Sequence, residues 1–345
     1  MLKIIQKFCF QPLFAEQLKE VYGILLEVIN VDIEDHGLLA VRIIKDSLQK
    51  NSMRLELVME RLENFVKEQL IDFPLKVERA FSDTMTDIEG EQKGAREKIH
   101  SKDSLRLMAE IHTIILIAMG VTEIKLKPDM MKLVPDIVKA LMLIPTKEKQ
   151  KKHKERFIEL IHAQSKLYFV IGNLIRISCN DELLVENAQK IAECSIAFLK
   201  NCPNELKQVR KIFFPVLKTI MTAYTDYFIN HLDDLMNYKF LVGEYKDLKT
   251  EAASIILTVG EYAKERLTNM QSRKFIELLI QMVNDLDLSL SDQSLAISYL
   301  NKSVDVIFRS PHNVSFRTLF VFLLCIKRIY REWGDEVFEE KIITK

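Results

Sequence analysis

The fold is decided by residues 156–211, whose sequence is RFIELIHAQSKLYFVIGNLIRISCNDELLVENAQKIAECSIAFLKNCPNELKQVRK. This stretch contains two amphipathic helical patterns and the start of a third, because apolar residues recur at three- and four-residue steps. The first pattern consists of Phe157, Ile158, Ile161, Leu167, Tyr168, Ile171, Leu174 and Ile175. The second consists of Leu184, Val185, Ala188, Ile191, Ala192, Ile196 and either Phe198 or Leu199. The stretch is therefore predicted to be a packing unit of helices, and it contains nothing that resembles a catalytic loop.

The junction after the second pattern contains residues typical of helix ends. Asn201 can adopt the left-handed conformation that ends a helix, and Pro203 can occupy the first position of the next one. Glu205 would then lie in the first turn, where the helix dipole favours a carboxylate. A tight turn is predicted here.

Length and composition extend this interpretation to the whole chain. With 345 residues the chain exceeds the size at which one compact core stops growing, so it forms either two domains or an elongated stack. Nine glycines and eight prolines are too few for the many tight turns of β-sandwiches and α/β folds. No long run alternates with a period of two, and helix pairs recur about every forty residues. The predicted fold is all-α, a HEAT-like helical-repeat superhelix (α-solenoid).

The predicted organisation has three parts: N-terminal helical repeats in 1–81, a flexible polar loop in 82–103, and repeats in 104–345 that continue the same solenoid. The second helix is expected to have Asp35 as its N-cap, and Phe73-Pro74 is expected to form a corner. Outside the opening stretch, helices are predicted at 13–30, 35–50, 53–70, 105–119, 128–141 (with Pro135 either kinking it or beginning its main segment), 204–222, 224–236, 249–266, 271–285, 289–309 and 312–333.

Composition also limits the environment and the chemistry of the chain. Lysine plus arginine balances aspartate plus glutamate at 49 each, so long-range attraction to nucleic acid or to anionic membrane is not expected. The N-terminus lacks the features of a signal peptide, and the apolar run 319–326 is too short for a membrane span. The cysteines are too scattered for a disulfide framework or a zinc site and indicate a reducing compartment: Cys9, Cys179, Cys194, Cys202 and Cys325.

No catalytic or cofactor motif is found. The segment 90–96 has two glycines and a lysine, but it lacks the order of a phosphate-binding loop. Carboxylate pairs such as Asp233-Asp234 are expected to be solvated surface charges, and no histidine lies in a zinc-binding helix pattern. We expect no cofactor, no metal and no enzymatic activity.

One local charge anomaly lies at 147–156. Three interpretations remain open: a solvated helix lead-in, a nuclear-import signal, or a patch for an acidic partner. No aromatic residues are interleaved with the cations, which argues against nucleic-acid binding. The cations are Lys147, Lys149, Lys151, Lys152, Lys154 and Arg156.

Short motifs in the opening stretch resemble a known family. They are Phe157-Ile158, Ala163-Gln164-x-Lys166, Leu174-Ile175-Arg176, Asn201-Cys202-Pro203 with Glu205, and Arg210-Lys211. Segments 228–245, 251–265 and 285–305 follow in the order seen in that family. Together they resemble the N-terminal HEAT-repeat region of the TRRAP (transformation/transcription domain-associated protein) family of PIKK-related pseudokinase co-activators. The resemblance covers about 155–310, and 20–145 more loosely.

The resemblance implies a non-enzymatic scaffold, in the nucleus, of histone acetyltransferase co-activator complexes of the SAGA type. Implied partners are subunits of those complexes and acidic activation domains of transcription factors, without sequence-specific nucleic acid and without membrane. We therefore place a candidate partner-binding patch among the 147–156 cations together with Lys207, Arg210 and Lys211. The alternative is an unrelated helical-repeat interaction module, such as a karyopherin-like transport receptor or another scaffold, and an enzyme ranks third.

Overall fold

A computed structural model describes most of the chain as helix. The described residues are 2, 17–50, 56–82, 104–121, 130–237, 240–241, 248–262, 268–285, 300–302, 304 and 316–333. Within these ranges all secondary-structure elements are helices and no β-strand occurs, which confirms the all-α prediction. In the same ranges, no helix combines the length and the apolar composition that crossing a bilayer requires.

The chain divides into two compact units, Met1–Val209 and Arg210–Lys345. The first unit contains α2 (Leu18–Val31), α3 (Glu34–Lys50), α4 (Glu56–Ala80), α6 (Leu105–Val121), α8 (Val134–Leu141), α9 (Lys147–Lys152), α10 (Lys154–Ser178) and α11 (Glu182–Asn201). The boundary falls inside α12 (Lys207–Ala223), and the second unit continues with the 3-10 helix η4 (Thr225–His231), α13 (Leu232–Leu235), α15 (Lys249–Tyr262), α16 (Asn269–Asp285) and α18 (Phe316–Trp333).

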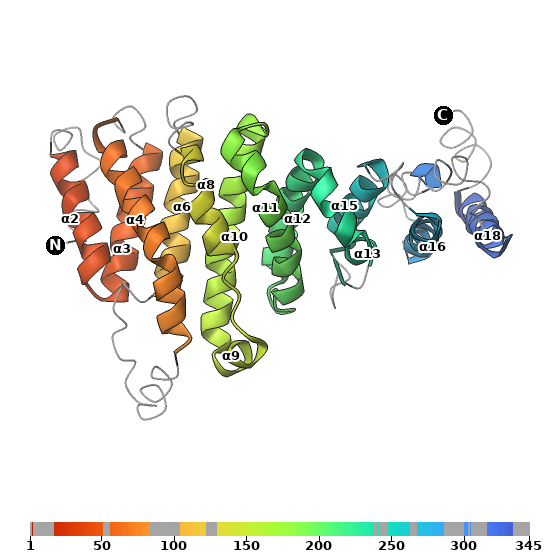
Figure 1. Cartoon of the computed structure of the whole chain (residues 1–345), viewed down its shortest axis with the longest axis horizontal. Helices are drawn as coiled ribbons and strands as arrows, with labels where there is room; N and C mark the ends of the chain where they lie inside the picture. Colours follow the sequence, from red (N-terminus) through yellow and green to blue (C-terminus); the bar gives the residue numbers. More distant parts are fainter. Residues whose placement is uncertain are drawn as a thin grey trace. The chain divides into compact units, whose positions relative to one another are not determined.

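Within the first unit the helices form two layers (Figure 1). One layer is the series α2, α4, α8 and α11, in which each helix contacts the next, and the other is the series α3, α6 and α10. Contacts of α2 with α3, α4 with α6, and α8 with α10 join the layers pairwise. This repeated pairing of helices across two layers is the arrangement of a HEAT-type helical repeat and confirms the predicted fold class.

The core of the first unit lies between the layers and uses the apolar stripes of the opening stretch. The rings of Tyr168 on α10 and Phe198 on α11 meet edge to face, with centroids 4.9 Å apart. Since each stripe faces a neighbouring helix, its burial supplies most of the stabilisation. Fully or almost fully buried members of the two stripes include Leu160, Leu167, Ile171, Leu174, Leu184, Ala188 and Ile191.

Buried polar side chains complete this core at the contact of α6, α8 and α10. Gln164 donates from Nε2 to the carbonyl oxygens of Ala140 (3.0 Å), Leu141 (3.4 Å) and Leu143 (2.9 Å), which lie at and just after the C-terminal end of α8. Such carbonyls have no partner within their own helix, so Gln164 acts as a cap supplied by the next helix. Nearby, Nδ1 of His112 on α6 lies 2.9 Å from the carbonyl oxygen of Ala163.

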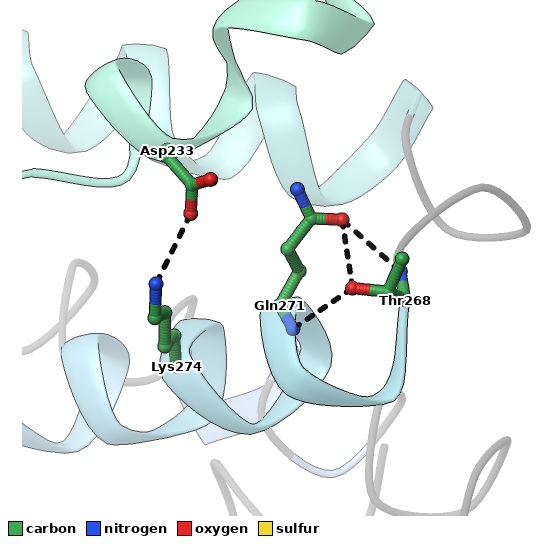
Figure 2. Close-up of polar contacts among 4 residues, drawn as sticks. All are labelled: Asp233, Thr268, Gln271 and Lys274. Carbon is green, nitrogen blue, oxygen red and sulfur yellow. Dashed lines mark hydrogen bonds and ion pairs between the residues drawn. The ribbon is translucent and has the colours of Figure 1, made fainter.

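The second unit contains a similar cap at the start of α16 (Figure 2). Gln271 Oε1 accepts hydrogen bonds from the backbone nitrogen and the hydroxyl of Thr268, at 3.1 Å each, while Thr268 Oγ1 accepts one from the Gln271 nitrogen. This reciprocal capping box explains why α16 begins at Asn269, two residues before the predicted 271. Lys274 on the same helix pairs with Asp233 of α13 at 3.3 Å.

Two predicted features near the N-terminus are wrong. Asp35 is not the N-cap, because α3 begins at Glu34 and Asp35 lies in its first turn. Phe73-Pro74 is not a corner, because α4 continues through Pro74 to Ala80. A proline inside a helix removes one backbone hydrogen bond. Here the buried neighbours Phe73 and Val77 hold the helix against the core on both sides of it.

The junction after α11 also differs from its prediction. Asn201 is the last helical residue rather than a left-handed terminator, and Cys202 follows with an extended backbone (φ −62°, ψ 118°). Pro203 and Glu205 precede α12, which begins only at Lys207, so neither lies in its first turn. A turn in which the Leu206 nitrogen bonds the Pro203 carbonyl fills the gap. The link is therefore longer than predicted, and it presents Glu205 to solvent.

The single helix predicted at 224–236 is instead the 3-10 helix η4 followed by the short α13. Further predicted boundaries agree with the structure or lie outside the described residues. Pro135 occupies the first turn of α8, as expected if it begins the main segment of the 128–141 helix, whose residues 128 and 129 are not described. Of the predicted loop 82–103 only Ser82 is described, and most of the predicted helix 289–309 is likewise outside the described residues. The predicted division at 81 and 103 stays a prediction.

Candidate partner-binding surface

The basic stretch folds as a separate short helix, α9, and the first turn of α10. Thr146 caps α9 by accepting a hydrogen bond from the Lys149 nitrogen. Gln150, on the inner side of α9, is buried and donates from Nε2 to the Pro145 carbonyl (2.7 Å) and to Asn201 Oδ1 (3.2 Å). Because Gln150 anchors the helix from within, the lysines that surround it are exposed: Lys147, Lys149, Lys151 and Lys152.

His153 forms the bend between α9 and α10. Its ring is buried and meets the ring of Phe81, just after α4, edge to face with centroids 5.8 Å apart. The bend separates the exposed lysines of α9 from Lys154 and Arg156, which already belong to α10. The stretch is therefore an ordered element fixed at both of its buried positions, Gln150 and His153.

Lys147, Lys154 and Arg156 of this stretch have polar partners close by. Lys154 Nζ lies 2.6 Å from Glu205 Oε1, and this hydrogen bond and charge lower the pKa of the Glu205 carboxyl. Lys147 donates to Asn201 Oδ1 at 2.8 Å. Arg156 lies 3.5 Å from Glu159, whose carboxyl has a raised pKa because burial outweighs the attraction of that arginine. The Glu205 carboxylate reduces the charge that the stretch presents outward, whereas the neutral amide of Asn201 does not.

The remaining candidate cations lie on α12, and the boundary between the two units separates Lys207 from Arg210 and Lys211. Lys207, in the first unit, is half-buried. In the second unit Arg210 is only 5% exposed and donates to the carbonyl oxygens of Phe240 (3.2 Å) and Leu241 (3.4 Å). Lys211 pairs with Glu251 at 3.3 Å. Little of Arg210 is therefore accessible to a partner.

The surface is thus smaller than the nine predicted residues. Its accessible part is the outer side of α9, with Lys149, Lys151 and Lys152, and the neutralising group that the sequence analysis missed is Glu205. Sequence separation hides this group, since Glu205 is 51 residues from Lys154. Only the return of α11 alongside α8 and α10 brings the two together, and no local motif predicts that.

Two findings concern metal ligands and cysteine thiols in the part of the chain that the structure describes. No group of three or more histidine, cysteine, aspartate or glutamate side chains is placed to hold a metal ion there. Burial raises the pKa of the Cys194 and Cys325 thiols to about 11, which keeps them neutral and poorly nucleophilic at neutral pH.

The layered helix pairs and this charged outer surface define a helical-repeat protein of the HEAT class. A family profile described as "Tra1 HEAT repeat central region" matches residues 156–328, half of the chain. The chain belongs to this family. The match confirms the predicted TRRAP-type family and includes the whole opening stretch. The profile describes the central HEAT region, whereas the expected resemblance was to the N-terminal HEAT region.

Curated relatives extend the similarity over almost the whole chain. The "Transformation/transcription domain-associated protein" of Homo sapiens and that of Danio rerio are each 21% identical to it over 379 aligned positions. The alignments cover 98% of this chain but only 10% of each relative, so the chain spans about a tenth of their length. No solved structure matches the chain.

Proposed function

We propose that the chain is a non-enzymatic scaffold segment of a TRRAP-like subunit of histone acetyltransferase co-activator complexes of the SAGA type, acting in the nucleus. The observation that carries this proposal is family membership, since the family profile matches half of the chain and the transcription-associated relatives align with nearly all of it. A stack of helix pairs suits this role, because it offers long surfaces that other proteins can bind.

Affinity purification of the tagged chain from nuclear extract tests this role. Co-purification of acetyltransferase-complex subunits is the expected result. Recovery of Ran-type GTPase and nuclear-pore proteins instead would favour the karyopherin-like alternative and contradict the proposal. No described residue favours that alternative specifically.

Within this role, the outer side of α9 is the proposed contact for acidic activation domains. Three ordered, exposed lysines on one short helix attract a polyanionic segment. The buried Gln150 and His153 anchor α9, so a partner meets lysines presented by an ordered helix rather than by an extended basic peptide. This geometry favours the acidic-partner interpretation of the basic stretch over an import signal.

The α9 contact can be tested by titrating a labelled acidic activation-domain peptide into the full chain. Charge reversal at Lys149, Lys151 and Lys152 together should weaken binding about tenfold at low salt and less at high salt. A matched control reverses the exposed Lys190 and Lys218 elsewhere on the chain. Equal affinity of the α9 variant and the control would show that α9 is not the contact. Arg210 is left unchanged, because its burial would make a loss of folding look like a loss of binding.

A further inference from the structure

The outer side of α4, in the first unit, combines two exposed apolar side chains with charges of both signs. Its inner side contacts α2, α6 and α8 and buries Phe65, Phe73 and Val77. In the middle of the outer side, the apolar pair Ile71 and Leu75 lie one turn apart and are 54% and 53% exposed. We call the exposed residues from 64 to 79 the α4 face: Asn64, Lys67, Glu68, Ile71, Asp72, Leu75, Glu78 and Arg79.

The charged residues of the α4 face form two flanks, one on each side of the apolar pair. With about 3.6 residues per helical turn, Lys67 and Glu78 lie on one flank. Glu68, Asp72 and Arg79 lie on the other flank. Along the chain the first flank runs from cation to anion, whereas the second flank runs from anion to cation. Each flank therefore has opposite charges at its two ends, and the two flanks have them in opposite order.

This order makes the α4 face complementary to a copy of itself in a two-fold pair, in which every contact occurs twice. If the two helices are antiparallel, each flank meets the same flank reversed. Glu68 of one copy then lies opposite Arg79 of the other, and Lys67 lies opposite Glu78. If the helices are parallel, unlike flanks meet, so Lys67 lies opposite Glu68 and Glu78 lies opposite Arg79. Both directions bring opposite charges together and place the apolar pair at the centre.

A hollow of about 410 Å³ lies on the flank that contains Glu68, between α4 and α2. Its lining consists of Asn30, Glu68, Gln69, Ile71, Asp72, Leu75, Lys76 and Arg79. Lys76 is almost fully buried there and donates to Gln69 Oε1 at 2.7 Å. Glu68 and Asp72 are one turn apart, and such a like-charge pair destabilises an isolated helix. A cation of the second copy reaches this flank in both directions and relieves that repulsion, and the hollow leaves room for its side chain.

We propose that the α4 face binds the α4 face of a second copy of this chain about a two-fold axis. The chain itself carries the complementary charge order, whereas a uniformly acidic or uniformly basic partner would meet like charges at one end of each flank. One pair of helices buries less than the roughly 1,200 Å² of a standard interface, so the dimer is weak, with a dissociation constant on the order of 10 to 100 μM. The inference goes beyond the proposed scaffold role and does not depend on α9.

Sedimentation equilibrium of the full chain at about 5 to 300 μM tests the proposal, and the unchanged chain should form a reversible dimer. Glu68→Arg and Arg79→Glu should each raise the dissociation constant about tenfold, because each places like charges across the pair twice in both directions. Ile71→Ser should weaken the dimer similarly by removing an apolar contact at its centre. The matched control Glu186→Arg, at an exposed position of α11, should leave the dimer unchanged. Circular dichroism of each variant should match the unchanged chain, because the substituted side chains are exposed.

Charge exchange distinguishes pairing of two α4 faces from any other cause of dimerisation. Glu68→Arg combined with Arg79→Glu restores the dimer if the helices are antiparallel. These two residues are about 16 Å apart along α4, so they cannot compensate each other within one chain. Lys67→Glu combined with Glu68→Lys restores the dimer if the helices are parallel. Restoration by one of the two double variants supports the proposal and gives the direction of pairing.

Three outcomes overturn the proposal: a chain that stays monomeric at the highest concentration, a dimer that is unaffected by Glu68→Arg, or failure of both double variants to restore the dimer. The peptide titration at α9 is independent of all three, since none of these substitutions lies on α9. Failure of the dimer therefore leaves the proposed scaffold role standing, and failure of the α9 contact leaves the dimer standing.

Discussion

Gln164 in the first unit and Arg210 in the second do the same work with different chemistry. Each is a long side chain, at most 5% exposed, that donates to successive backbone carbonyls of a neighbouring segment. Gln164 is neutral and reaches carbonyls at the end of α8, whereas Arg210 brings a charge to the carbonyls of Phe240 and Leu241. In both units a buried polar side chain donates to carbonyl oxygens of a neighbouring segment, an amide in one unit and a guanidinium in the other.

The comparison teaches that a cation's neighbours in sequence do not decide its exposure. Arg210 follows Lys207 closely and was grouped with the surface cations, yet it is buried because carbonyl acceptors meet it. Its direct neighbour Lys211 is exposed, and the lysines of α9 remain in solvent because Gln150 occupies the inner side of their helix. Substitutions at these sites test the difference.

The largest effect is expected at Gln164. The substitution Gln164→Leu keeps the size and burial of the side chain but leaves three carbonyl contacts unmade, and it should lower the free energy of unfolding by about 3 kcal/mol. Urea unfolding followed by circular dichroism measures this. The control Gln189→Leu, on the exposed side of α11, should change it by less than about 0.5 kcal/mol. If both variants were equally stable, Gln164 would not be the cap that its geometry indicates.

A smaller, pH-dependent effect is expected at His112, next to the Gln164 cap. Burial is the main cause that lowers its pKa from 6.5 to about 4, with Lys76 adding to the shift and the Ala163 hydrogen bond opposing it. Its Nε2 has no hydrogen-bond partner among the described residues, so a proton there would be unsatisfied. Between pH 6.5 and pH 4, His112 is therefore protonated in the unfolded chain but stays neutral in the folded chain. The contribution of the buried neutral His112 to the free energy of unfolding is therefore complete above pH 6.5, and it is lost as the pH falls toward 4.

Between pH 7 and pH 5, this linkage should lower the free energy of unfolding by about 2 kcal/mol. The variant His112→Asn should show a shallower dependence over that interval, although its overall stability is lower. Urea midpoints at pH 7, 6 and 5 for both proteins measure the slope. The same slope in both would mean that His112 does not refuse the proton in the folded state.

In the second unit, Arg210→Met should destabilise by about 1.5 kcal/mol. The loss of two hydrogen bonds to carbonyl oxygens is partly offset, because the methionine no longer requires a charge to be buried. The matched control is Lys211→Met, which removes only a half-exposed ion pair with Glu251 and should cost at most about 0.5 kcal/mol. Thermal unfolding of both variants makes the comparison. Equal melting temperatures would place Arg210 among the surface cations after all.

The sequence was sufficient to predict those helices whose position depends only on the periodicity of apolar residues. The stripes of α10 and α11 predicted the helices, their buried residues and the all-α repeat class, and the motifs around Ala163-Gln164 predicted the family. It was insufficient where tertiary contacts override a local signal. Pro74 normally breaks a helix, but Phe73 and Val77 hold α4 in the core.

The accessible part of the candidate surface could not be predicted from the sequence for a related reason. Glu205 and Arg210 acquire their roles from residues 30 to 51 positions away, and no spacing rule contains that information. The α9 lysines were predictable as a charged stretch, but the contacts of Lys147 with Asn201 and of Lys154 with Glu205 depend on tertiary structure.

The smallest effect on stability is expected at the exposed lysines of α9. Because Lys149 and Lys151 are exposed and form no ion pair with a described carboxylate, reversing both to glutamate should change the free energy of unfolding by less than about 0.5 kcal/mol. Thermal unfolding checks this before any binding measurement is interpreted. A loss above about 1 kcal/mol would mean that these lysines support the packing of α9. The contrast between a buried cation at Arg210 and solvent-facing cations on α9 would then no longer hold, since both would be structural.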